Sequence, residues 1–335
     1  MRRLLLTALV LTGVVGCGDD VDPVSLVTRP RILGFDLSVE GDPERTTPAP
    51  GETLTITVPF AFPEESLDVD FQGIACFGVD VGFGIPFCAG DESDPTGGIF
   101  ALLADRSTAP AFPVVSFPIP PEAADGTTVL VIAATCAGGV VDPELLSSAL
   151  DPTQPLDGSL EVCAGGVGTG ELVQSRIPVQ LEEDDTNTRP LSLVQVELDG
   201  QLMGPDPGAV PGTPCAEMAE LVTLRVDGDA VDLIVEGAPE TFEDFFREGA
   251  DDQPIATVED MQVALLITSG EVQANFLFLE RDDVVEDTEY TPATSEERTL
   301  DLSGSLERLW FSVRDERGGL AVESRAFCLL PPAPI

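Results

Sequence analysis

Short segments in which apolar and polar residues alternate recur along the chain, and this pattern constrains the fold more than any other feature of the sequence. In RILGFDLSVE, small or polar residues alternate with four apolar residues: Leu33, Phe35, Leu37 and Val39. A period of two residues places these four side chains on one face of a β-strand. The segment therefore predicts a strand with one buried face, and PGETLTITV at residues 50–58 repeats the pattern.

Further strands are predicted in both halves of the chain. VLVIAATC, residues 129–136, is a continuous apolar run rich in Val and Ile, which is typical of a central sandwich strand and argues against a helix. In the second half, LVQVELDG, LVTLRVDGDAVDLIV and MQVALLITSGEVQANFLFLE predict strands. We expect the last two to be hairpins that turn near residues 227–228 and 269–270. LWFSVRDERGGLAVESRAFCLL predicts a closing hairpin that turns at Gly318 and Gly319.

One segment, PETFEDFFREG, predicts a helix. Pro239 suits the first turn of a helix, and Gly249 suits the position after its end. Phe242, Phe245 and Phe246 lie at helical spacing and would form an apolar stripe. We interpret this stripe as core packing and not as a groove for a ligand.

The fold class that these segments predict is all-β, with two tandem antiparallel β-sandwich domains of immunoglobulin-like architecture. Many short strands together with 29 Pro and 32 Gly favour sandwiches over a parallel α/β sheet. The length favours two domains, and the acidic, proline-ended run LEEDDTNTRP marks the seam. We expect insertions such as the loops that begin at Asp91 and Val141, and loops of this kind often carry binding residues. The expected boundaries are 29–183 for domain 1, 184–190 for an acidic linker and 191–335 for domain 2.

Two short sequence repeats favour a tandem duplication. Thr-Arg-Pro occurs at residues 28–30 and again at 188–190, each time before an alternating strand. Ser-Arg occurs at residues 175–176 before IPVQL and at 324–325 before AFCLL. The number of residues from Thr-Arg-Pro to Ser-Arg is similar in the two halves, as expected if one sandwich unit was duplicated.

The first residues predict a secretory signal peptide. Arg2 and Arg3 precede an apolar run, Leu4–Val15, that is too short to span a membrane. Val14-Val15-Gly16-Cys17 resembles the lipobox of bacterial lipoprotein signal peptides. The resemblance implies removal of residues 1–16, lipidation of the Cys17 sulfur and a short tether over residues 17–28, and acyl chains would hold the protein on a membrane. The alternative is an ordinary signal peptide in which the cysteine is incidental.

Missing residue types restrict the chemistry available to the chain. All 16 basic residues are arginine, and neither Lys nor His is present among 335 residues. Histidine relays, imidazole metal ligands, Schiff bases and P-loop lysines are therefore excluded. A net charge of −44 also disfavours nucleic acid as a partner. We expect no enzyme and no cofactor, and a carboxylate-based hydrolase is the alternative that remains, although a single Trp and a single Tyr offer few platforms for a sugar.

The six cysteines that follow Cys17 predict three disulfide bonds, because an even number in an exported chain is typical of a disulfide framework. The expected second domain contains two of them, which should pair. The four in the first domain allow three connectivities, and we favour the two local pairs. The favoured pairs are Cys76–Cys88, Cys136–Cys163 and Cys215–Cys328.

The linker is a candidate calcium site. Five potential oxygen ligands lie within six positions, and calcium takes six to eight oxygens. They are Glu182, Glu183, Asp184, Asp185 and Asn187. The alternative, which we favour, is a solvated acidic linker.

The chain resembles a group of bacterial lipoproteins, of the kind found in myxobacteria, that carry immunoglobulin-like sandwiches behind a lipobox. The resemblance rests on the lipobox, on RPRILGFDLSVEGDPERTTPAPGETLTITV, on TRPLSLVQVELDG and on WFSVRDERGGLAVESRAFC. It implies a fold and a place in the cell, and it carries over no catalytic residue.

These observations predict a non-enzymatic lipoprotein of a bacterial cell envelope, attached to the outer membrane through its lipid, that serves as a binding or structural scaffold. Its partner would be another protein or a surface. The alternative is a periplasm-facing accessory subunit of an envelope assembly or secretion machine.

Overall fold

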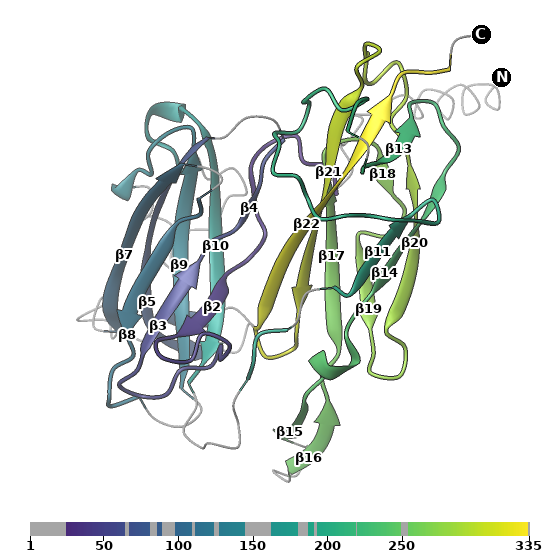
Figure 1. Cartoon of the computed structure of the whole chain (residues 1–335). Helices are drawn as coiled ribbons and strands as arrows, with labels where there is room; N and C mark the ends of the chain where they lie inside the picture. The colour runs from purple at the N-terminus through teal and green to yellow at the C-terminus, as the bar shows by residue number, and fades with distance from the viewer. Residues whose placement is uncertain are drawn as a thin grey trace, which may run out of the picture.

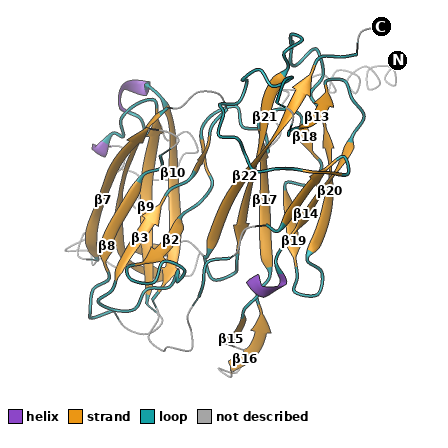
Figure 2. Ribbon diagram, viewed as in Figure 1, coloured by secondary structure: helices purple, strands orange, loops and turns teal. Residues whose placement is uncertain are grey.

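The computed structural model describes most of the chain, and almost all of its regular structure is β-strand (Figure 1, Figure 2). Two short 3₁₀ turns, η1 (Ala164–Gly166) and η3 (Pro239–Thr241), interrupt the loops. No helix among the described residues has the length and apolarity needed to cross a membrane. The described residues are 25–63, 67–80, 86–88, 98–108, 111–123, 127–144, 162–179, 187–190, 193–218, 220–248 and 254–333.

Two main sheets face each other in the first half of the chain. One has the order β2-β3-β8, and the other has the order β10-β9-β5, with both β6 and β7 paired to β5. Their facing side chains form one hydrophobic core that includes Leu54, Ile56 and Phe71. The strands are β1 (Arg31–Ile32), β2 (Asp36–Val39), β3 (Thr53–Thr57), β4 (Phe60–Ala61), β5 (Asp68–Asp80), β6 (Pro86–Cys88), β7 (Ile99–Thr108), β8 (Val114–Pro118), β9 (Thr128–Ala137) and β10 (Thr169–Pro178).

A second core lies between two further sheets in the second half. Their orders are β12-β11-β14-β20-β18 and β13-β22-β21-β17-β19, and a separate hairpin joins β15 to β16. Pairing is antiparallel except between β13 and β22, which are parallel. The strands are β11 (Gln195–Leu198), β12 (Gln201–Leu202), β13 (Val222–Arg225), β14 (Val231–Glu236), β15 (Asp244–Glu248), β16 (Pro254–Val258), β17 (Met261–Ile267), β18 (Glu271–Val272), β19 (Phe276–Leu279), β20 (Val285–Thr291), β21 (Ser305–Arg314) and β22 (Leu320–Leu330).

The strand order in both halves is that of an immunoglobulin-like sandwich. In the second half, β11, β14, β20 and β18 take the places of strands A, B, E and D, and β22, β21 and β17 those of G, F and C. In the first half, β2, β3 and β8 correspond to A, B and E, and β10, β9 and β5 to G, F and C. The order A-B-E facing G-F-C is therefore present in each half, and the second half adds a strand in the place of D.

The alternating segments are buried on the faces that the sequence predicted. The four alternating apolar residues of RILGFDLSVE are all buried, as are Leu54, Ile56 and Val58. The apolar run of residues 129–136 lies in β9, which is paired on both sides, by β10 and β5. The closing hairpin is also confirmed, with β21 paired to β22 and Gly318 at φ 96° in the turn.

One predicted hairpin is wrong. Asp227 takes a positive φ of 55°, so a turn is present, but β13 and β14 do not pair with each other. The chain crosses here from one sheet to the other, where β13 joins β22 and β14 joins β11 and β20. The other predicted hairpin is confirmed in its pairing, since β17 pairs with β19, but not as a tight turn at residues 269–270, because β18 joins the opposite sheet between them. Alternation predicts which face of a strand is buried, whereas the partner depends on the whole sandwich.

The predicted helix is also wrong beyond its first turn. Pro239 does begin a helical turn, but η3 ends at Thr241, and residues 244–248 then form β15, paired with β16. A ten-residue helix is marginal without tertiary packing. Here tertiary packing favours the strand. Phe242 packs into the second core, and the guanidinium group of Arg317 stacks over the ring of Phe245.

The predicted tether is shorter than residues 17–28. Ser25 and Val27 are buried, and the backbone of this segment forms a parallel bridge to Ile267 at the end of β17. The Val27 N–H donates to Ile267 O at 2.7 Å, and the Ile267 N–H donates to Ser25 O at 2.8 Å. The segment that leads into the first sandwich is therefore attached to the second.

Candidate functional site

The predicted disulfide bonds are all present. Cys76 of β5 is bonded to Cys88 of β6, and Cys136 of β9 is bonded to Cys163. The third bond joins Cys215 to Cys328 of β22 across 113 positions of sequence. The last two bonds lie in small buried apolar clusters, so their role is structural. Cys17, the predicted lipidation site, lies outside the described residues.

The described part of the linker holds the two halves of the chain together. The Asn187 side chain is fully buried, and its amide N–H donates to Asp315 Oδ2 at 3.1 Å. The Asn187 backbone accepts a hydrogen bond from Thr46 N–H at 2.9 Å and donates one to the Thr47 hydroxyl at 3.0 Å. Asn187 thus connects a loop of the first sandwich to the β21–β22 turn of the second. The other four candidate calcium ligands, residues 182–185, lie outside the described residues, and no group of carboxylates or thiolates within the described ranges could hold a metal ion.

An apolar contact forms the centre of the junction between the two sandwiches. Trp310, the single tryptophan, is only 5% exposed although it lies on the outer face of β21. It packs against Val27, Leu33 and Ala61 from the first part of the chain. Beside this contact, the Ser312 hydroxyl donates to Leu33 O at 3.1 Å. The junction therefore combines apolar burial with directed hydrogen bonds.

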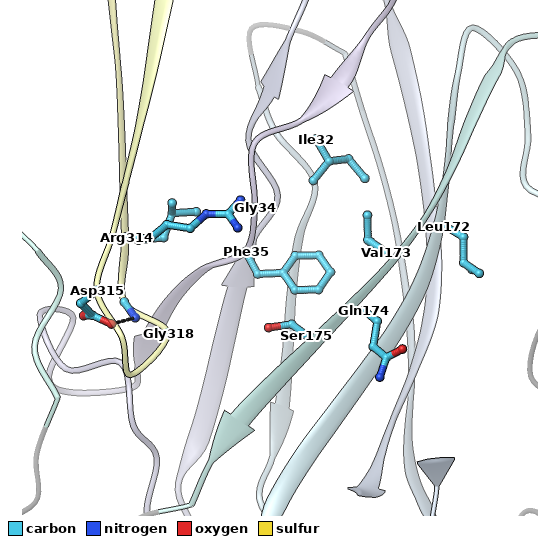
Figure 3. A pocket seen from close by; sticks show the side chains of 12 residues that line it. Ile32, Gly34, Phe35, Leu172, Val173, Gln174, Ser175, Arg314, Asp315 and Gly318 are labelled. Atoms are coloured by element: carbon cyan, nitrogen blue, oxygen red, sulfur yellow. Dashed lines mark hydrogen bonds between the residues drawn. The ribbon is translucent and has the colours of Figure 1, made fainter. Parts of the chain in front are cut away.

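A pocket of about 400 Å³ opens at this junction, and it is the best candidate for a functional site (Figure 3). Its walls come from three segments far apart in sequence: residues 32–35, strand β10 and the β21–β22 hairpin. Phe35 lies between Arg314 and the side chains of β10 in this view, although it is 7% exposed and its ring packs against Phe71 in the first core. The volume lies within the range typical of small-molecule sites, which are mostly apolar with a few convergent polar groups.

Arg314 supplies positive charge to the pocket. Its guanidinium group donates from Nη2 to Leu33 O and from Nε to Ser312 Oγ, the latter at 3.3 Å. Burial lowers the pKa of Arg314 from its ordinary value, and an arginine remains charged nonetheless. Arg314 forms no ion pair with any carboxylate in the part of the chain that the structure describes.

Asp315 is the carboxylate that lines the pocket, and its oxygens are already engaged. Oδ1 accepts hydrogen bonds from the N–H groups of Gly319 at 2.7 Å and Arg317 at 2.8 Å, and Oδ2 accepts one from Asn187. Burial raises the pKa of Asp315, and these hydrogen bonds oppose the effect. Asp315 therefore shapes the turn and the linker, and it is not free to bind a cation.

Next to the pocket, three carboxylates surround one guanidinium group. Arg317 forms ion pairs with Glu243 and Glu259, and Asp315 lies close enough to Glu259 to raise its pKa. Glu259 is only 1% exposed, and burial raises its pKa to about 7. The Thr188 hydroxyl of the linker donates to Glu243. This cluster joins β15, the β21–β22 turn and the linker, so its role is to position these elements.

Comparisons with known proteins identify no family. No protein-family model matches the chain, and no curated protein matches it either. The structure of Escherichia coli alpha-2-macroglobulin activated by porcine elastase is 11% identical, with a TM-score of 0.21, over 89% of this chain and 22% of that chain, so this chain spans about a fifth of that protein's length. The two tandem V-type regions of VCBP3, a v-region-containing chitin binding protein, are 7% identical, with a TM-score of 0.24, over 88% of this chain and 99% of that chain. Both TM-scores are low, so the strand order of the chain itself carries the fold assignment.

The junction pocket was not predicted from the sequence. Its residues occur in RILGF, in LVQS of β10 and in SVRDERGGL, and we interpreted the first and last of these stretches as scaffold strands. The sequence feature that could have indicated this site was the glycine within an alternating apolar segment. Gly34 has a φ of 146°, which glycine adopts readily. A Cβ at this position would lie 3.0 Å from Arg314 Nη2 and 2.8 Å from a methyl group of Leu320.

Proposed function

We propose that the protein is a lipid-anchored scaffold of a bacterial cell envelope, built from two tandem immunoglobulin-like domains, without a catalytic role. The observation that carries the proposal is the set of three disulfide bonds in a chain that begins with a signal-like segment. Stable disulfide bonds form in oxidising compartments such as the periplasm and the cell surface. The lipobox-like residues before Cys17 then account for attachment to a membrane, which we propose to be the outer membrane.

Two separate hydrophobic cores support the division into domains at residues 29–183 and 191–335. Each core lies between two facing sheets. Linker residues 187–190 form hydrogen bonds to both halves of the chain. Their contact through Trp310 and Asn187 favours a fixed relative position, as a scaffold that presents a surface requires.

The buried carboxyl groups favour a structural role over hydrolysis. A catalytic acid or base must reach a substrate, but the carboxyl groups whose pKa burial raises are held by protein partners. Glu307, for example, is fully buried and pairs with Arg298 at 2.9 Å. Glu259 is held by Arg317, and Glu323 is held by Arg325.

The attachment of the N-terminal segment suggests how the anchor holds the protein. Ser25 lies against the end of β17, so a lipidated Cys17 would be eight positions from the second sandwich. Eight residues span at most about 29 Å when fully extended. The second domain would therefore stay close to the membrane, although the first domain precedes it in sequence.

The test of the anchor is fractionation of cells that express the wild-type protein or Cys17→Ser. We expect the wild-type protein in the membrane fraction and the variant in the soluble exported fraction. Equal membrane retention of both would contradict lipid anchoring at Cys17.

Protease treatment of intact cells, with Cys17→Ser as the unanchored control, then distinguishes the two envelope roles. Digestion of the wild-type protein on intact cells favours a scaffold on the cell surface. Protection until the outer membrane is permeabilised favours a periplasmic accessory subunit, and cross-linking would identify its neighbours.

A further inference from the structure

Arg314 has no carboxylate partner among the described residues, which is unusual for a chain with a net charge of −44. Eight other arginines form ion pairs with carboxylates: Arg45, Arg106, Arg189, Arg281, Arg298, Arg308, Arg317 and Arg325. Arg314 instead contacts a carbonyl oxygen and a hydroxyl group, both uncharged. The Arg314 side chain is exposed, so its guanidinium group is accessible to an anion that enters the pocket and has no carboxylate partner to displace.

The guanidinium group of Arg314 is held in place before any ligand arrives. Leu33 O and Ser312 Oγ accept from two of its five N–H groups, and Ser312 Oγ itself donates to Leu33 O. Gly34 allows this arrangement, because a Cβ there would lie 3.0 Å from Nη2. The remaining donors form a planar fork of the kind that pairs with a carboxylate. Holding the donors in advance lowers the entropy cost of binding.

Apolar side chains form much of the remaining wall. Ile32 and, on β10, Val173 are half-buried, whereas Phe35 and Leu320 are almost fully buried. A ligand that fills about 400 Å³ between them would bury an apolar group of several carbon atoms. Burial of that group contributes roughly 25 cal/mol per Å² of apolar surface.

Carboxylates in and beside the pocket limit the charge of the ligand. Asp315 lines the pocket, and Glu171 of β10 lies beside it, where its Oε2 accepts from Ile32 N–H at 2.9 Å. Both carboxylates accept hydrogen bonds from backbone N–H groups, and both would repel a multiply charged anion. A ligand with one negative charge near Arg314 is therefore favoured over phosphate.

We propose that the junction pocket binds a small organic monocarboxylate whose carboxylate pairs with Arg314 and whose apolar part lies against Ile32 and Val173. The inference goes beyond the scaffold role, and it does not depend on the anchor. A free aliphatic or aromatic acid and the C-terminal carboxylate of a short peptide share this chemistry.

Isothermal titration calorimetry on the full-length mature chain with Cys17→Ser tests the proposal. The probes are octanoate, 3-phenylpropionate and a short peptide with an apolar C-terminal residue, and the controls are octanamide, the amidated peptide and inorganic phosphate. We expect one-to-one binding of at least one carboxylate, with at least tenfold weaker binding of its amide and of phosphate. Octanoate or 3-phenylpropionate as the tightest probe indicates a free acid, whereas the peptide indicates a chain terminus.

Two variants separate the pocket from other sites. Arg314→Gln should weaken binding at least tenfold, whereas Arg225→Gln, on a surface arginine that also donates to a backbone carbonyl, should change it less than twofold. If Arg314→Gln fails to fold, as judged by circular dichroism, Val173→Trp narrows the pocket with Arg314 retained and should also abolish binding. The proposal is overturned if no carboxylate binds, if the amides or phosphate bind as tightly, or if the folded variants bind as the wild-type protein does.

Discussion

Replacing Glu259 by Gln should flatten the pH dependence of stability. The buried glutamate has a pKa of about 7 in the folded chain, and an ordinary glutamate has 4.5. Between these values the folded chain holds a proton that the unfolded chain does not. This contribution to stability is therefore complete below pH 4.5 and is lost as the pH rises through 7. The difference between the two pKa values corresponds to at most about 3 kcal/mol.

The largest cause is the burial of Glu259, which penalises the charged form of its carboxyl group. The nearby carboxylates of Asp315 and Glu243 raise the pKa further, and Arg317 opposes the shift. Gln at position 259 keeps the oxygen that accepts from Arg317 Nε and cannot titrate. The wild-type protein should lose stability from pH 5 to pH 7.5, and Glu259→Gln should lose about 2 to 3 kcal/mol less.

Urea unfolding followed by the fluorescence of Trp310 at pH 5, 6, 7 and 7.5 measures this difference. Other carboxyl groups whose pKa burial raises act in the same direction, so the comparison between variants is the decisive quantity. Glu240→Gln, on an exposed neighbour in η3, is the matched control and should follow the wild-type curve. Equal slopes for the wild-type protein and Glu259→Gln would refute the reasoning.

Three further outcomes are expected. Replacing Cys215 and Cys328 together by Ser opens a loop of 113 positions and should lower the free energy of unfolding by about 4 to 5 kcal/mol, measured in urea. Leu33→Ala leaves a cavity beside the buried tryptophan and should cost about 2 to 4 kcal/mol with a red-shifted emission, whereas Leu302→Ala, on an exposed side chain, should change neither. EDTA followed by calcium should leave the melting temperature unchanged, because the Asn187 amide is bonded to a protein carboxylate, and a rise with calcium would restore the linker as a metal site.

Strand faces were predictable because alternation is a local property. Leu33, Leu37 and Val39 needed only the period of two to be assigned to a buried face. Pairing partners were less accessible to the same reasoning, since a turn at Asp227 fits a hairpin and a crossover between sheets equally well. The three disulfide pairs were predictable because the division at the linker left few alternatives.

The helix predicted from Pro239 onward shows where local preference loses to tertiary contacts. Three phenylalanines at helical spacing describe an apolar stripe, but the same residues also fit a strand when a partner is present. Here β16 supplies that partner, and Arg317 lies over the Phe245 ring at 5.0 Å. Neither contact is visible in the eleven residues of the segment.

The sequence by itself determined the all-β class, the buried faces of the strands and the residue types that the chain lacks, because each depends on residue type or on short-range periodicity. The tertiary structure alone decided that the N-terminal segment attaches to the second sandwich and that Trp310 lies in the junction. It also decided that Gly34, β10 and Arg314 enclose one pocket. These residues are separated by as many as 280 positions, and such contacts depend on how two complete sandwiches pack, which no local pattern records.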